Sequence, residues 1–138
     1  MHGVADEALI DMGDFAGGML KYVRQHPVPN ITIAGGFAKL VKLAQGALDL
    51  HSARSQVDME WLAGQVADLA LNQNMSERIR NANTAAEVLE LTQSAGIDLA
   101  KRVAELARQT AIATLRDAPV SVEIIVVDRE GKVLACAT

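Results

Sequence analysis

Hydrophobic and polar positions recur with two different periods along the chain, and each period predicts one type of element. The stretches Glu7 to Met12 and Ile31 to Ala34 are short and mostly apolar, which is typical of buried strands. After each of them, at residues 15–25 and 37–47, apolar positions recur every three or four residues and predict an amphipathic helix. This strand-helix-strand-helix order, with short connections, favours two parallel strands joined by a crossover helix.

The middle of the chain is predicted to be almost entirely helical. Thr84 and Glu87 have the spacing of a capping box, and Ser76 and Asp98 are also predicted to cap helices. The helix after Asp98 has two adjacent stripes, which predicts packing on two sides, one of them close. The apolar stripes of this region are Met59, Leu62, Val66 and Leu69; then Leu99, Val103, Leu106, Thr110 and Ala113; and the small-residue stripe Ala100, Ala104, Ala107 and Ala111.

Beyond Pro119 the period changes to two, which predicts a strand over Val120 to Val127. A turn at residues 128–132 and a return strand from Val133 to Cys136 complete a β-hairpin. A lone hairpin is marginal in water, and the two upstream strands already have places in the parallel unit. We therefore predict that the hairpin belongs to a sheet with strands from outside this chain, or packs against its own helices with one edge exposed. Because unpaired strand edges promote association, we also expect a homodimer through residues 120–136.

These elements predict an α/β fold with α+β character at the C-terminus, arranged as one fragment. Its parts are a β-α-β-α unit at residues 7–50, a helical arm at 51–117 and the hairpin at 119–137. A chain of 138 residues suits a single domain.

Composition narrows the classes of partner. Only 3% of the residues are aromatic and the net charge is -4, which argues against nucleic-acid binding. No apolar run reaches the length of a membrane span. Cys136 is the only cysteine, so an internal disulfide framework is excluded and a reducing, cytoplasmic location is expected.

The most informative stretch for function runs from Asn30 to Asp58. Gly35 and Gly36 lie between a strand and a helix start, where free backbone N–H groups can bind an anionic or carboxylate-bearing ligand; the alternative is a tight turn alone. Lys39 and Lys42 share one helix face, as ligand contacts or as solvated surface lysines. Gly13 and Asp14 follow the first strand. Since parallel strands end at one edge, we expect Asp14, Gly35, Gly36 and Lys39 at the rim of one crevice.

The turn after the second helix contains His51, Ser52 and Arg54. His51 is interpreted either as a turn residue bonded to local backbone or as a polar contact or proton carrier at the ligand. Ser55 and Asp58 fit a capping box with Asp in place of Glu. No other His or Cys lies at metal-ligand spacing, so no metal site is predicted, and no set of nucleophile, base and acid is visible. Trp61 is expected to be a core or interface anchor.

Several segments resemble one known family over residues 8–135. They are DMGDFAGGMLKYVR, GGFAKLVKLAQGALDLHSARSQVDMEWLA and ANTAAEVLEL, of which the run G-x-x-x-K-L-x-K-L-A followed by H-S is the most specific. They resemble the C-terminal part of the cobalt-precorrin-5B C-1-methyltransferases of anaerobic cobalamin biosynthesis, the CbiD type. The chain departs from that pattern at Asp14, where the family commonly has Asn, and at Ala38, where it often has Gly.

The resemblance implies S-adenosylmethionine as cofactor and a corrinoid small-molecule substrate, with cobalt present only as part of that substrate. It also implies that an N-terminal part of the same enzyme is missing, which we expect to complete the sheet of the 119–137 hairpin, and that the fragment alone is inactive. The lysines, Arg54 and the glycine amides would form a face for the substrate's carboxylates, and catalytic residues are not assigned. The competing hypothesis is a non-catalytic ligand-binding or assembly module.

Overall fold

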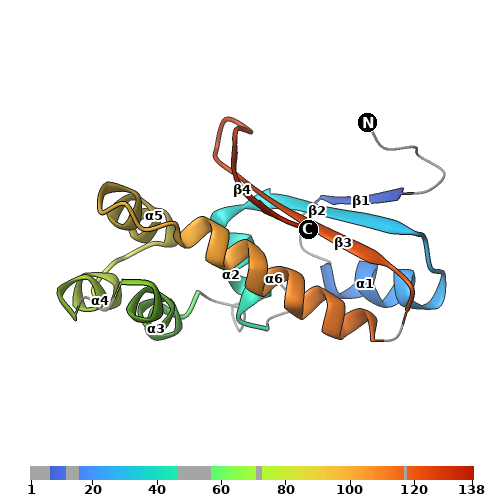
Figure 1. Cartoon of the computed structure of the whole chain (residues 1–138), viewed down its shortest axis with the longest axis horizontal. Helices are drawn as coiled ribbons and strands as arrows, with labels where there is room; N and C mark the ends of the chain where they lie inside the picture. Colours follow the sequence, from blue (N-terminus) through green and yellow to red (C-terminus); the bar gives the residue numbers. More distant parts are fainter. Residues whose placement is uncertain (1–6, 12–15, 47–56, 71–72, 117) are drawn as a thin grey trace.

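The computed structural model describes residues 7–11, 16–46, 57–70, 73–116 and 118–138 (Figure 1). Strands and helices follow the order that the sequence predicts, and the α/β fold class with a C-terminal hairpin is confirmed. The strands are β1 (Glu7–Asp11), β2 (Asn30–Gly36), β3 (Ser121–Val127) and β4 (Val133–Ala137). The helices are α1 (Ala16–Gln25), α2 (Phe37–Ala44), α3 (Met59–Ala70), α4 (Gln73–Arg80), α5 (Ala85–Ser94) and α6 (Leu99–Leu115).

The four strands form one sheet in the order β1-β2-β3-β4. The pairs β1-β2 and β2-β3 are parallel, and β3-β4 is antiparallel. The expectation that the hairpin finds no partner strand in this chain was wrong, because β2 has two edges and β1 occupies only one of them. β3 pairs along the whole of the other edge, from Asn30 opposite Ser121 to Gly36 opposite Val127. Further strands from outside the chain, and a homodimer, stay predictions.

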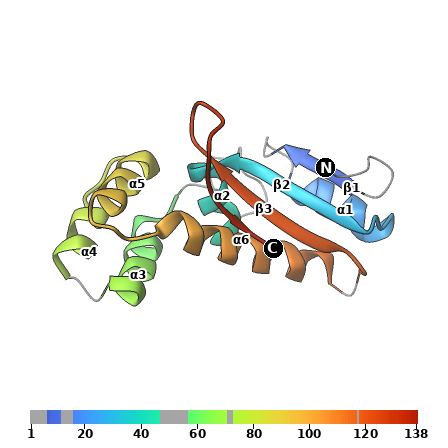
Figure 2. The same ribbon diagram turned by 45° about the horizontal axis from the view of Figure 1, so that its top comes forward.

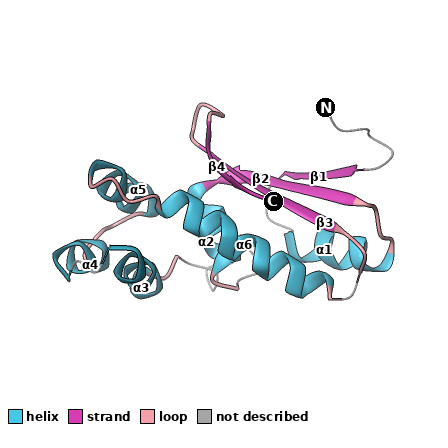
Figure 3. Cartoon of the chain, viewed as in Figure 1, coloured by secondary structure: helices cyan, strands magenta, loops and turns pink. Residues whose placement is uncertain are grey.

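Helices α1, α2 and α6 lie on one face of this sheet (Figures 1 and 2). The strand residues of that face are fully buried and form the core with the apolar sides of the three helices. They are Ile31, Ile33, Val122, Ile124 and Val126. Alternate positions belong to the opposite face, where the Thr32 hydroxyl donates to a Glu123 carboxylate oxygen at 3.1 Å. Within the described ranges, no helix covers that face (Figure 3).

The small-residue stripe of α6 is buried as predicted. Ala104, Ala107 and Ala111 are inaccessible to solvent, and the helix packs on α2 and on the hairpin strands. The second predicted stripe is only partly buried, since Leu106 is half-buried and Ala113 is exposed. The buried face instead continues to Leu115 at the end of the helix.

Helices α3, α4 and α5 form a separate group at one end of the molecule (Figures 1 and 3). Two of the predicted caps are confirmed: the Thr84 hydroxyl accepts from the Glu87 amide, and the Asp98 carboxylate accepts from the Lys101 amide, both at 3.1 Å. The third is wrong. Ser76 lies inside α4 and is buried, because that helix begins three residues earlier, at Gln73.

Two side chains of α6 bind backbone carbonyls of the hairpin. β4 pairs with β3 only as far back as Ile124, so Val122 of β3 has no partner in β4. The Arg108 guanidinium donates to the Val122 carbonyl instead, at 2.9 Å. The Lys101 ammonium donates to the Cys136 carbonyl of the edge strand β4 at 2.6 Å. A strand edge whose carbonyls already accept hydrogen bonds, and which is covered by a lysine, is less able to pair with another strand. This weakens the reason for expecting a dimer through the β4 edge.

Candidate functional site

The candidate site begins where β2 passes directly into α2. The sequence predicts that the strand ends before the two glycines, but β2 continues through Gly35 and Gly36, which pair with Val126 and Val127 of β3. Gly36 is both the last strand residue and the N-cap of α2, with φ -71 and ψ 160. Extended backbone of this kind is open to any residue, so the glycine is not required by a turn.

The space in front of the Gly36 cap is open. A Cβ built on Gly36 would meet no atom within 4 Å, and no side chain caps the helix. The first N–H groups of α2 have no partner inside the helix and carry part of its positive dipole charge. A glycine at this position therefore leaves a carboxylate or other small anion free to approach the helix start.

Lys39 and Lys42 lie on the outer side of α2. The buried side of this helix consists of Phe37, Leu40, Val41 and Leu43, and both lysines are half-buried. Lys39 belongs to the first turn, beside the open cap, and in the described part of the chain it makes no ion pair. The structure thus places Lys39 in the first turn of α2 and Lys42 in the last turn.

The carboxyl ends of the three parallel strands, β1, β2 and β3, lie side by side at the end of the sheet that contains Gly36. Asp11 of β1 is opposite Ala34, and Val127 of β3 is opposite Gly36. The predicted meeting of the strand ends is therefore confirmed. Gly13 and Asp14 lie outside the described residues, so their position at the rim of a crevice stays a prediction.

His51, Ser52 and Arg54 also lie outside the described residues, but the two ends of their segment are placed. The amide of Asp58 donates to the Gln45 side-chain oxygen at 3.0 Å, which joins the end of α2 to the start of α3. α2 has eight residues, so it is about 12 Å long. The two ends of the segment that contains His51 therefore lie about one length of α2 from Gly36. The hydrogen bond between Asp58 and Gln45 could not be predicted from the sequence.

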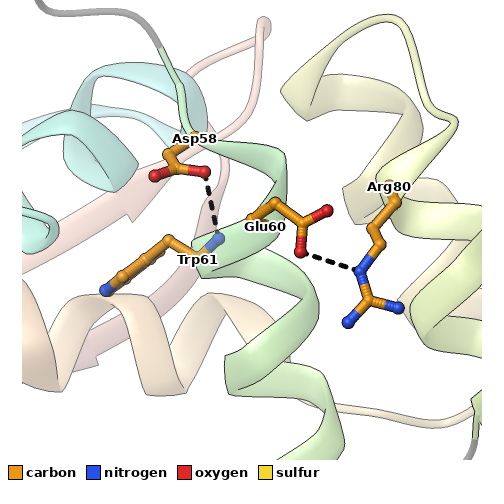
Figure 4. Close-up of polar contacts among 4 residues, drawn as sticks. All are labelled: Asp58, Glu60, Trp61 and Arg80. Atoms are coloured by element: carbon orange, nitrogen blue, oxygen red, sulfur yellow. Dashed lines mark hydrogen bonds and ion pairs between the residues drawn. The ribbon is translucent and has the colours of Figure 1, made fainter.

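The start of α3 differs from the predicted capping box. Asp58 is itself the N-cap, because its carboxylate accepts from the Trp61 amide at 3.1 Å (Figure 4). Trp61 is half-buried against the core, in agreement with its expected role as an anchor. Glu60 and Arg80 join α3 to α4 at 2.9 Å, with both side chains largely exposed (Figure 4). An exposed pair of this kind contributes about 0–1 kcal/mol.

The described residues contain neither a metal-binding cluster nor a helix suited to crossing a membrane. No group of three or more His, Cys, Asp or Glu residues within these ranges could hold a metal ion. Among the described helices, none has both the length and the apolarity needed to cross a membrane.

Comparison with known proteins gives one consistent result. Residues 49–138 match the family described as CbiD, C-terminal domain. The cobalt-precorrin-5B C(1)-methyltransferases of Brucella ovis, Brucella canis and Brucella suis are each 64% identical to this chain over 136 residues. The alignment covers 98% of this chain but only 37% of each relative. No solved structure matches the chain. The chain therefore belongs to the CbiD family, and it corresponds to the C-terminal part of its longer members.

Proposed function

We propose that this chain is the C-terminal part of a methyltransferase that transfers a methyl group to C-1 of cobalt-precorrin-5B in anaerobic cobalamin biosynthesis. The observation that supports this function is the 64% identity over 98% of the chain to proteins of that name. The aligned span of 136 residues includes the strand ends, α2 and the segment that follows it. The remaining part of the enzyme would come from the region of the relatives that this chain does not span.

The proposed methyl donor is S-adenosylmethionine, which supplies a methyl group on a sulfonium centre. Transfer of that group requires alignment of donor and acceptor more than acid-base chemistry, so a site made of binding groups is sufficient. The open cap at Gly36, the first amides of α2 and Lys39 fit a ligand carboxylate. The donor has one carboxylate and a corrinoid substrate has several, and either would be held and oriented there.

The remaining candidates keep their proposed roles as ligand contacts. They are Gly13, Asp14, Gly35, Lys42, His51, Ser52 and Arg54. The competing hypothesis of a non-catalytic module has no support from the relatives' names, which all describe a methyltransferase.

The first test compares the isolated chain with the full-length enzyme. We expect the full-length enzyme to add one methyl group to cobalt-precorrin-5B, detected by mass spectrometry, and the 138-residue chain to add none. The reason is that the chain spans only 37% of the length of its relatives. A full-length enzyme without methylation would contradict the proposed function. Turnover by the short chain would contradict only the need for the remaining part.

A second prediction concerns His51 in the full-length enzyme. We expect His51→Ala to lower kcat/KM by about tenfold, as when one ligand contact is lost, and to change the free energy of unfolding by less than about 1 kcal/mol. Activity and thermal unfolding are measured on the same preparation. Wild-type activity would return His51 to the role of a turn residue, and an unfolded variant would make that role structural.

A further inference from the structure

A second candidate site lies on the helical side of the molecule, away from the Gly36 cap. An open pocket of about 370 Å³ lies between α1, the end of α2 and the last turns of α6. Lys21 and Arg24 come from α1, Gly46 follows α2, and Thr110, Thr114 and Arg116 come from α6. The volume is within the range of small-molecule sites. Because Gly36 and Gly46 lie at opposite ends of α2, this pocket is distinct from the site at the strand ends.

The pocket is positively charged, although the chain as a whole has a net charge of -4. Its described lining includes one ammonium and two guanidinium groups and no carboxylate. Within the described ranges, none of the three cations makes an ion pair or a side-chain hydrogen bond. Like charges around one cavity repel one another unless an anion lies between them.

The neighbouring threonines do not supply donors for such an anion. The Thr114 hydroxyl donates to the Thr110 carbonyl at 2.9 Å, and the Thr110 hydroxyl donates to the Ala44 carbonyl at 3.4 Å. Their hydroxyl hydrogens are therefore engaged in holding α6 and α2. Lys21, Arg24 and Arg116 remain as the donors of the pocket, and guanidinium groups are suited to bidentate binding of carboxylate or phosphate.

Arg116 has a backbone conformation that an arginine rarely adopts. Its φ of 56 and ψ of -123 place it in a region that favours glycine, directly after α6. Among the described non-glycine residues, no other has a positive φ. Strain of this kind persists when the surrounding structure imposes it, and it is concentrated at binding and catalytic sites.

Favourable interaction with helix C-termini is the alternative reason for cations here. Arg24 lies in the last turn of α1 and Arg116 follows α6, where a positive charge stabilises the helix dipole. That reason does not apply to Lys21, which lies in the middle of α1. It also requires no strained backbone at Arg116.

We infer that this pocket binds an oxyanion, a carboxylate or phosphate group of a small molecule, through Lys21, Arg24 and Arg116. The inference does not depend on the proposed methyl transfer. It rests on three cations that line one pocket and make no ion pair with the described residues, together with the strained position of one of them.

The test titrates the 138-residue chain with sodium citrate and, separately, with inorganic phosphate, at ionic strength held constant with sodium chloride. Binding is followed by NMR at the amide of Gly46, which lines the pocket. We expect saturable shifts of this amide, and at least about tenfold weaker binding in the double variant Lys21→Gln/Arg24→Gln and in Arg116→Gly. Saturation by citrate alone indicates a carboxylate ligand, and saturation by phosphate alone indicates a phosphate ligand.

The variants also separate loss of binding from loss of folding. Arg116→Gly relieves the positive φ, so its Tm without added anion should rise by roughly 3 °C while its anion affinity falls. Arg129→Gln is the matched control, since it removes an exposed guanidinium from the turn of the hairpin, and it should bind as the wild type does. The inference is overturned if neither probe shifts Gly46 saturably. It is equally overturned if the pocket variants and Arg129→Gln bind the probes with the same affinity.

Discussion

Replacing Gly36 with aspartate is expected to lower the kcat/KM of the full-length enzyme by about 100-fold without unfolding it, a loss of roughly 2.7 kcal/mol. The backbone of Gly36 suits any residue, and a Cβ there would meet no atom within 4 Å. Aspartate is a preferred N-cap and differs little from glycine there, so we expect the free energy of unfolding to rise by about 0.3 kcal/mol at most. Its carboxylate would occupy the first amides of α2 and repel an incoming anion.

Gly36→Asn is the matched control, because asparagine has nearly the same shape and capping ability but no charge. We expect Gly36→Asp to lower kcat/KM at least about tenfold more than Gly36→Asn, since the mechanism depends on the added negative charge. Steady-state kinetics and thermal unfolding of both variants provide the comparison. Equal losses of kcat/KM in the two variants would mean that activity requires the space in front of Gly36 to be free of any side chain. The anion-binding interpretation would then be wrong. Full activity in both variants would remove Gly36 from the site.

Truncation of Ile124 to alanine should destabilise the chain by about 3 kcal/mol. This side chain belongs to the central strand β3 and is fully buried between the sheet and the helices that cover it. Its removal would leave a cavity in the layer that joins the sheet to α6. Since small domains have a free energy of unfolding of about 5–15 kcal/mol, the loss would be a large fraction of the total. Urea denaturation followed by circular dichroism measures it.

The next residue is a matched control of the same type. Ile125 lies one position along the same strand and is only half-buried, on the face that the described helices leave uncovered. We expect Ile125→Ala to cost less than half as much as Ile124→Ala. A larger loss at Ile125 would contradict the assignment of the two faces, and it would indicate that another element covers this side of the sheet.

The elements were predictable from sequence where local periodicity determines them. Apolar spacing predicts the two N-terminal strands. Proline predicts the end of α1 at Gln25, and glycine predicts the turn of the hairpin. The end of β2 did not follow, because a pair of glycines is typical of a turn. In this chain β3 supplies ladder partners for Gly35 and Gly36, so tertiary pairing extends the strand through both.

The candidate site was predictable only in part, for a similar physical reason. Gly36 and Lys39 are close in sequence, and the rule for parallel strand ends places them at one edge. The pocket cations come from α1 and from the end of α6, which are distant in sequence and meet only after the chain has folded. No periodicity connects Lys21 with Arg116. The Gln45–Asp58 contact could not be predicted either, because the capping box that includes Asp58 indicates no partner at the end of α2.

This contact between Gln45 and Asp58 has a consequence for how the chain tolerates changes in length. It brings both ends of the intervening segment to within one hydrogen bond of each other. Lengthening a closed loop is inexpensive, because each doubling adds only about 0.6 kcal/mol of closure entropy. We therefore expect insertions between these two residues to leave α2 and α3 in place and to change the free energy of unfolding by less than about 1 kcal/mol.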